Sequence, residues 1–172
     1  MISHWAYILI GNDKTGKTNF QKYLINNLCD LEYERLHCNL RFEICHPRIP
    51  HGVKTISLMN RSYQEKDYES VDVFFAKHFQ DADICILSSH VKDDSANDIE
   101  EMTIHLKRRA KNVAAVFFSN GFNNDAQNIS LLEWDERLFL QNDLVDQEMI
   151  PAQLNRLADD FSDFLINRSV HW

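Results

Sequence analysis

Segments in which apolar residues have strand-like spacing are followed along this chain by segments in which they have helix-like spacing. Short apolar runs are typical of strands buried on both faces, and strict alternation is typical of half-buried strands. The expected strands are residues 5–10, 36–44, 53–59, 83–88 and 113–118, with a last one at 129–132 or at 138–140. The second and third alternate, and the turn between them, with Pro47 and Pro50, is too short for a parallel crossover. We therefore expect these two strands to form an antiparallel pair.

Longer segments between these strands repeat apolar residues at helical spacing. In the first of them Phe20, Leu24, Ile25 and Leu28 share one face. The expected helices are residues 17–28, 66–80, 98–111 and 151–166. Strands that alternate with helices indicate an α/β fold, with a mostly parallel sheet of about six strands, one of them antiparallel, and helices on both faces. Neither an internal repeat nor a linker interrupts the 172 residues, so we expect a single domain over 1–172.

Charge and composition exclude several classes of partner. Eighteen Lys and Arg against 26 Asp and Glu give a net charge of −8, which argues against general affinity for nucleic acid or anionic lipid. No apolar run approaches the length of a membrane span, and the apolar stretch near the N-terminus lacks the flanks of a signal peptide. The four cysteines lack metal-finger spacing and are expected to be reduced thiols. We expect a cytoplasmic protein without a membrane span.

The strongest motif follows the first expected strand directly. Residues 11–18 read G-N-D-K-T-G-K-T and match the phosphate-binding loop G-x-x-x-x-G-K-[ST] between a strand and a helix. Glycine permits the backbone angles with which such a loop turns its amides toward an anion. Lys17 can reach the β- and γ-phosphates, and the Thr18 hydroxyl can ligate Mg²⁺. The expected phosphate-binding residues are Gly11, Asn12, Asp13, Lys14, Thr15, Gly16, Lys17 and Thr18.

With this loop, the chain resembles the small GTPases, the Ras-like and Arf-like proteins, over nearly its whole length. The Arf-type loop also carries Asp at its third position, here Asp13. The family's D-x-x-G-Q-E element falls at residues 60–65, and its guanine motif N-K-x-D falls at 120–123. The resemblance implies a Ras-like P-loop NTPase fold that binds a nucleoside triphosphate, GTP rather than ATP, with Mg²⁺ and a regulatory protein partner. It places Asn120 and Asn123 at the base. It also implies two catalytic residues, Lys17 on the phosphates and Gln64 on the attacking water.

Several residues depart from the motifs of that family. Asn60 replaces the Asp that holds a Mg²⁺-bound water, and Tyr63 replaces the Gly whose amide meets the γ-phosphate. Gly121 and Asn123 replace the Lys and Asp that recognise guanine, and residues 19–54 contain no Ser or Thr to close over the metal. These departures predict a shallow guanine preference and slow or partner-assisted hydrolysis. A pseudo-GTPase interaction module and a small-molecule P-loop kinase remain as alternatives; the kinase would need an Arg-rich lid and an acidic base.

Other polar residues have a functional and a plainer interpretation. His90 follows an expected strand at the ligand edge of the sheet, where it could touch substrate or a catalytic water, although a plain loop histidine is favoured. Residues 107–109, Lys-Arg-Arg, could form a phosphate lid or simply complement a helix C-terminus, which we favour. Cys38 and Cys45 point to opposite faces of an extended strand, so we do not expect a zinc site there.

Overall fold

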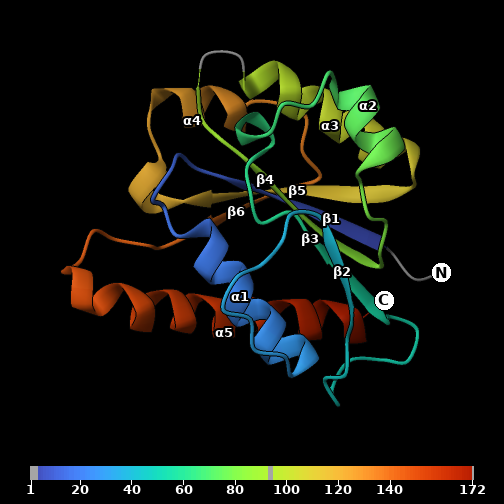
Figure 1. The fold of residues 1–172 in the computed structure, drawn as a ribbon, viewed down its shortest axis with the longest axis vertical. Helices are drawn as coiled ribbons and strands as arrows, with labels where there is room; N and C mark the ends of the chain where they lie inside the picture. Colours follow the sequence, from blue (N-terminus) through green and yellow to red (C-terminus); the bar gives the residue numbers. More distant parts are fainter. Residues whose placement is uncertain (1–3, 93–94, 172) are drawn as a thin grey trace.

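The chain folds as an α/β protein in a computed structural model that describes residues 4–92 and 95–171 (Figure 1). The strands are β1 (His4–Ile10), β2 (Leu40–Glu43), β3 (Thr55–Leu58), β4 (Ile84–Ser89), β5 (Lys111–Phe118) and β6 (Glu136–Leu140). The helices are α1 (Lys17–Cys29), α2 (Val71–Lys77), α3 (Ser95–Arg108), α4 (Asn124–Ser130) and α5 (Ile150–Val170). Short 3₁₀ turns lie at Tyr63–Glu65, Ser119–Gly121 and Gln147–Met149.

All six strands form one sheet in the order β2-β3-β4-β1-β5-β6. The β2–β3 pair is antiparallel and the other pairs are parallel, which confirms the mostly parallel sheet with one antiparallel strand. β4 therefore lies between β1, which precedes the glycine-rich loop, and β3, which leads to Asn60.

Helices cover both faces of this sheet, as expected. Figure 1 shows α1 and α5 on one face and α2, α3 and α4 on the other. Alternate residues of β1 point to the two sides: Tyr7 and Leu9 enter the apolar core beneath α1 and α5, whereas Ala6 and Ile8 enter the core beneath α2 and α3. The alternation explains why β1 reads as an unbroken apolar run.

The helices that follow β1 and β4 lie on opposite faces, although the two strands are neighbours. Such a change of direction opens a crevice at the carboxyl ends of the strands, where ligands of open α/β sheets bind. The loop 11–16 lies at this point, and the Gly11 amide donates to the Ser89 carbonyl at 3.2 Å. The fold thus places the sequence motif at the expected ligand edge.

Several expected boundaries are wrong. β2 begins at Leu40 rather than at 36, and α2 is much shorter than 66–80. α3 begins at Ser95, ahead of the expected start at 98. Residues 129–132 are not a strand, because Ile129 lies in α4, a short polar helix that the periodicity did not predict. The last strand is instead β6, which includes the other expected segment, 138–140.

Candidate functional site

The loop between β1 and α1 turns back on itself through two left-handed residues. Lys14 has a φ of 64° and Gly16 a φ of 95°. Gly16 is also the N-cap of α1, whose first amides have no partner within the helix. At Gly11 a Cβ would lie 2.9 Å from Oγ1 of Thr15 on the other side of the loop. The two motif glycines therefore stand where a side chain would be strained or crowded, and the loop is closed tightly on itself.

Lys17 lies inside this loop and is 7% exposed. Its Nζ donates to the carbonyl oxygens of Gly11 and Asn12, at 2.9 Å for Asn12, and lies 3.4 Å from Oγ1 of Thr15. Burial lowers the pKa of Lys17 to about 8, while the carboxylates of Glu65 and Asp13 act in the opposite direction. The ammonium group is thus held among loop oxygens in a poorly hydrated place, where a phosphate would give it stronger acceptors.

Polar side chains outside the motif hold the loop in place. The Thr15 hydroxyl donates to the Asn12 carbonyl at 2.8 Å, and the Thr15 carbonyl accepts from Nδ2 of buried Asn142 at 2.8 Å. Asn142 in turn accepts from Gln153 of α5 at 2.6 Å. On the other side, Oδ1 of Asn12 accepts from the Val91 amide at 3.1 Å. Asn142 was not among the expected site residues, because it follows β6 in a segment without any motif.

Thr18 and Asn60 meet beside the loop. The Thr18 hydroxyl donates to the Asn60 carbonyl at 2.9 Å, and Nδ2 of Asn60 donates to the Leu36 carbonyl at 2.7 Å. Oδ1 of Asn60 is buried and has no hydrogen-bond partner among the described residues. A hydroxyl and an unpartnered amide oxygen are neutral oxygen donors of the kind that Mg²⁺ accepts. Thr18 is the expected metal residue, and Asn60 lies beside it; nothing in their geometry selects Mg²⁺ over another hard cation.

A cleft of about 240 Å³ runs along this side of the loop. It is lined by Asp13, Lys14, Thr15, Gly16, Lys17, Thr18, Asn19, Asn60 and Glu65. A second cleft, of about 350 Å³, shares Thr18, Asn60 and Glu65 and adds the cationic side chains Lys22, Arg35 and Arg61. The two clefts therefore adjoin at Thr18, Asn60 and Glu65, and the second one is bordered by cationic residues. Arg35 lies outside every sequence motif and was not expected there.

Gln64 does not lie free over the loop. Its amide nitrogen donates to Oγ of Ser89 and to Oδ2 of Asp98, both at 3.0 Å, and its Oε1 accepts from the His90 amide at 2.9 Å. These bonds attach the 3₁₀ turn Tyr63–Glu65 to β4 and α3. The neighbouring Tyr63 ring is buried and packs against Phe74, so it is directed into the core rather than over the loop 11–16.

The residue next to Gln64 joins a cluster that the sequence did not reveal. Nε2 of His90 lies 2.8 Å from Oε1 of Glu65 and 3.1 Å from Oδ1 of Asp13. The ligand atoms of the three residues all lie within 4.8 Å of one another, close enough to hold a metal ion. The imidazole is 3% exposed, whereas Asp13 and Glu65 are exposed residues. His90 is therefore a buried link between the loop 11–16 and the turn that carries Glu65, rather than a plain loop histidine.

A separate cleft of about 380 Å³ lies on the opposite side of the loop, where the resemblance places the base. It is lined by Asn12, Asp13, Lys14, Thr15, Asn120, Gly121, Phe122, Asn123 and Leu144. Oδ1 of Asn120 is buried and has no partner among the residues that the structure describes. Oδ1 of Asn123 instead accepts from the Ala126 amide at 3.0 Å and caps α4. Of the two expected base-binding residues, Asn123 already has a structural role.

The remaining candidates do not assemble into a second site. Lys107 and Arg108 lie in the last turn of α3, where they favour the helix dipole. The Arg109 guanidinium packs over the Phe75 ring at 4.9 Å and over the Phe79 ring at 5.6 Å, which is a packing role. The four cysteines are free, and neither Cys38 nor Cys45 belongs to a group of metal-ligating side chains among the described residues.

Comparison with known proteins adds no relative. No family model matches the chain, and no curated protein matches it. Among residues 4–92 and 95–171, no helix is both long enough and apolar enough to cross a membrane.

Proposed function

We propose that this protein binds a nucleoside triphosphate, with the phosphates in the loop 11–16 and at the start of α1. The observation that carries this proposal is the position of Lys17. A lysine buried within a loop, with its ammonium on the carbonyls of Gly11 and Asn12, is costly unless an anion is its partner. The loop also lies at the crevice where α/β sheets bind ligands.

The two clefts on either side of the loop support the orientation of such a ligand. The cleft with Thr18 and Asn60 suits the terminal phosphates and a divalent cation, and the cleft with Asn120 and Gly121 suits the base. Mg²⁺, when bound, would neutralise charge on the phosphates. Thr18 and Asn60 would hold it, and Lys17 would contact the phosphate oxygens. The small-GTPase resemblance favours GTP over ATP, and the base cleft is compatible with either.

We propose further that the protein hydrolyses the nucleotide slowly, in the manner of a small GTPase with incomplete switch motifs. The engaged amide of Gln64 favours this reading, because a side chain bonded to Ser89, Asp98 and the His90 amide is not available to orient water. The same observation supports the second candidate, a pseudo-GTPase module that binds nucleotide and a protein partner with little turnover.

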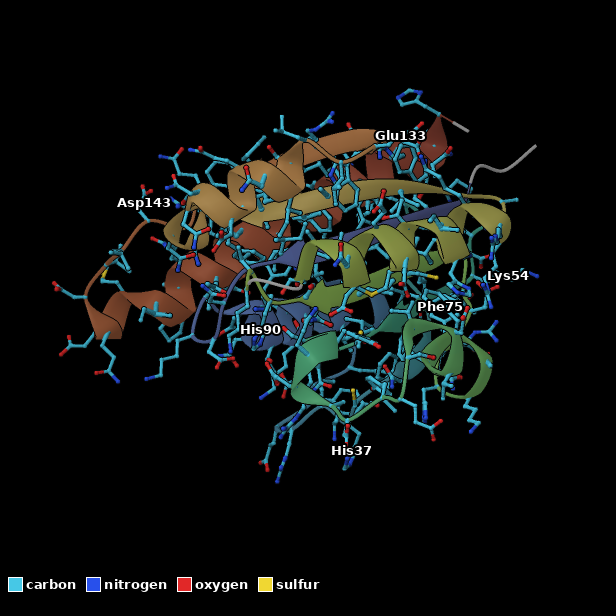
Figure 2. All side chains as sticks on the ribbon, turned by 90° about the horizontal axis from the view of Figure 1, so that it is seen from above. His37, Lys54, Phe75, His90, Glu133 and Asp143 are labelled. Atoms are coloured by element: carbon cyan, nitrogen blue, oxygen red, sulfur yellow. The ribbon has the colours of Figure 1, made fainter. Side chains whose placement is uncertain are left out.

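The test is equilibrium binding of fluorescent GTP and ATP analogues in the presence of Mg²⁺. Lys17→Ala should abolish binding while the circular dichroism spectrum is retained. Lys54→Ala is the matched control, because Lys54 is exposed and lies at the other end of the sheet from His90 (Figure 2). Equal affinity in the parent and Lys17→Ala would refute the proposed site, and a loss in both variants would show a general charge effect.

A further inference from the structure

Two acidic residues, Asp13 and Glu65, line the cleft on the Thr18 side of the loop, and Glu65 is the one that comes from outside the loop. It lines both clefts there, together with Thr18 and Asn60. Its carboxylate also acts on the buried ammonium of Lys17, where it opposes the effect of burial on the pKa of the lysine. A ligand whose last phosphate contacts Lys17 would therefore place that phosphate within the space that Glu65 borders.

The turn that carries Glu65 is held through both Gln64 and Glu65. The Gln64 amide nitrogen donates to Ser89 of β4 and to Asp98 of α3, and its oxygen accepts from the His90 backbone amide. The imidazole of His90 then holds the Glu65 carboxylate itself, at 2.8 Å. Because His90 is almost wholly buried, its ring has little freedom to leave that position. Gln64 and His90 together fix where the Glu65 carboxylate stands.

We propose that Glu65 is the general base of nucleotide hydrolysis and that His90 is its positioning residue. This inference rests on the proposed function. The oxygen of the attacking water forms a bond to the γ-phosphorus, and its proton moves to the Glu65 carboxylate. The bond between the γ-phosphorus and the β–γ bridging oxygen breaks, and its electron pair leaves on the nucleoside diphosphate. Inorganic phosphate is the second product, and Glu65 returns the proton to solvent.

The geometry of His90 favours this role over a metal site made by Asp13, Glu65 and His90. A histidine that ligates a metal through Nε2 carries its proton on Nδ1 and normally donates it to an acceptor. Nδ1 of His90 is buried and has no partner among the described residues. With the proton on Nε2, the ring donates directly to Glu65 and Asp13, as the two distances indicate. We therefore assign His90 as a hydrogen-bond donor to the carboxylates.

The experiment measures nucleotide affinity and single-turnover hydrolysis of γ-labelled GTP and ATP with Mg²⁺ in the same variants. Glu65→Gln keeps the size of the side chain and removes the base, so the hydrolysis rate should fall about tenfold or more. Affinity should stay within about threefold, because the proton transfer occurs only in the transition state. Glu69→Gln, an exposed carboxylate on the same loop, is the control and should hydrolyse at the parental rate.

His90 is tested with a pair of variants. His90→Ala should slow hydrolysis to about the level of Glu65→Gln with affinity retained, and His90→Gln, whose amide can still donate to Glu65, should recover a measurable part of the rate. Equal rates in the two His90 variants would overturn the positioning role. So would Zn²⁺ or Mn²⁺ binding without nucleotide that His90→Ala abolishes.

The outcomes separate this inference from the proposed function. Failure of the parent to bind either nucleotide would overturn both. Nucleotide binding with an unchanged hydrolysis rate in Glu65→Gln would overturn the assignment of Glu65 alone. A larger loss of rate in Asp13→Asn than in Glu65→Gln, at retained affinity, would move the base to Asp13 and also overturn it.

Discussion

Leu154 of α5 packs directly against Gly16 in the loop between β1 and α1. A Cβ at Gly16 would lie 2.7 Å from Cδ2 and 2.9 Å from Cδ1 of Leu154, and the φ of Gly16 is 95°. Leu154, near the start of α5, therefore lies against the loop, and a side chain at position 16 would force its methyl groups to move. The relationship links a residue near the start of the chain to one near its end through the core beneath α1 and α5.

This contact predicts that Gly16→Ala destabilises the protein. A left-handed φ alone costs about 1–3 kcal/mol in a residue other than glycine, and the collision with Leu154 adds to that. Urea unfolding should show that the free energy of unfolding falls by at least the backbone cost of about 1–3 kcal/mol. Adding Leu154→Ala should remove the collision and leave the backbone strain, so the two substitutions should not be additive. Gly16→Ala with parental stability would contradict the described loop.

The pKa of Lys17 predicts proton uptake when a nucleotide binds. In the free protein, burial lowers this pKa from 10.5 to about 8, so above pH 8 much of Lys17 is neutral. A phosphate favours the charged form and raises the pKa in the complex. The complex then binds more protons than the free protein above pH 8, and affinity should fall as pH rises from there.

Calorimetric titrations in buffers of different ionisation enthalpy measure this uptake. At a pH above 8 the protein should gain up to one proton per nucleotide, and the gain should shrink toward pH 7, where Lys17 is already charged. Proton release on binding, or an affinity that rises above pH 8, would show that Lys17 does not meet the phosphates in its charged form.

A shallow base preference follows from the role of Asn123. A neutral amide that already caps α4 cannot replace a carboxylate acceptor, and a hydrogen bond to a charged group is worth about 1.5–3 kcal/mol. Competition binding should thus show a preference for GTP over ATP that is about 10- to 100-fold smaller than a complete motif would give. Asn123→Asp retains an N-cap and should increase the preference for GTP. Selectivity of many thousandfold in the parent would indicate base recognition by other residues.

Much of the candidate site could be predicted because it is local in sequence. The apolar run of β1, the spacing of Gly11, Gly16, Lys17 and Thr18, and the helix after them lie within one continuous segment. The contact of Thr18 with Asn60 joins residues 42 positions apart, and only the family resemblance suggested that they belong together. Local periodicity specifies elements and does not specify which strands become neighbours.

The structural roles of Glu65 and His90 could not be predicted for the same reason. Their contact depends on β4 lying beside β1 and on the turn Tyr63–Glu65 lying over the end of β4. The motif comparison instead drew attention to Gln64, whose side chain faces Ser89 and Asp98. α4 was missed because its sequence, NDAQNIS, buries only Ala126 and Ile129 and lacks an apolar stripe.

Unaided turnover should be slow. Lys17 and Thr18 are in place, yet residues 19–54 provide no Ser or Thr to close over a metal, and Gln64 is bonded elsewhere. Small GTPases and related proteins with complete motifs hydrolyse at about 10⁻⁴ to 10⁻² per second without an added arginine. A single-turnover assay with Mg²⁺ should give a rate within or below that range. A rate near one per second, abolished by Lys17→Ala, would show a complete catalytic site.

The central claim is that phosphates bind at residues 11–18, and amide chemical shifts of the ¹⁵N-labelled protein test it most directly. Addition of a non-hydrolysable GTP analogue with Mg²⁺ should shift the amides of Gly16, Lys17 and Thr18 most, with smaller shifts at Asn120 and Gly121 in the base cleft. The Lys17→Ala protein should show none of these changes. A saturating nucleotide that leaves residues 11–18 unshifted, or that shifts amides elsewhere alone, would contradict the account.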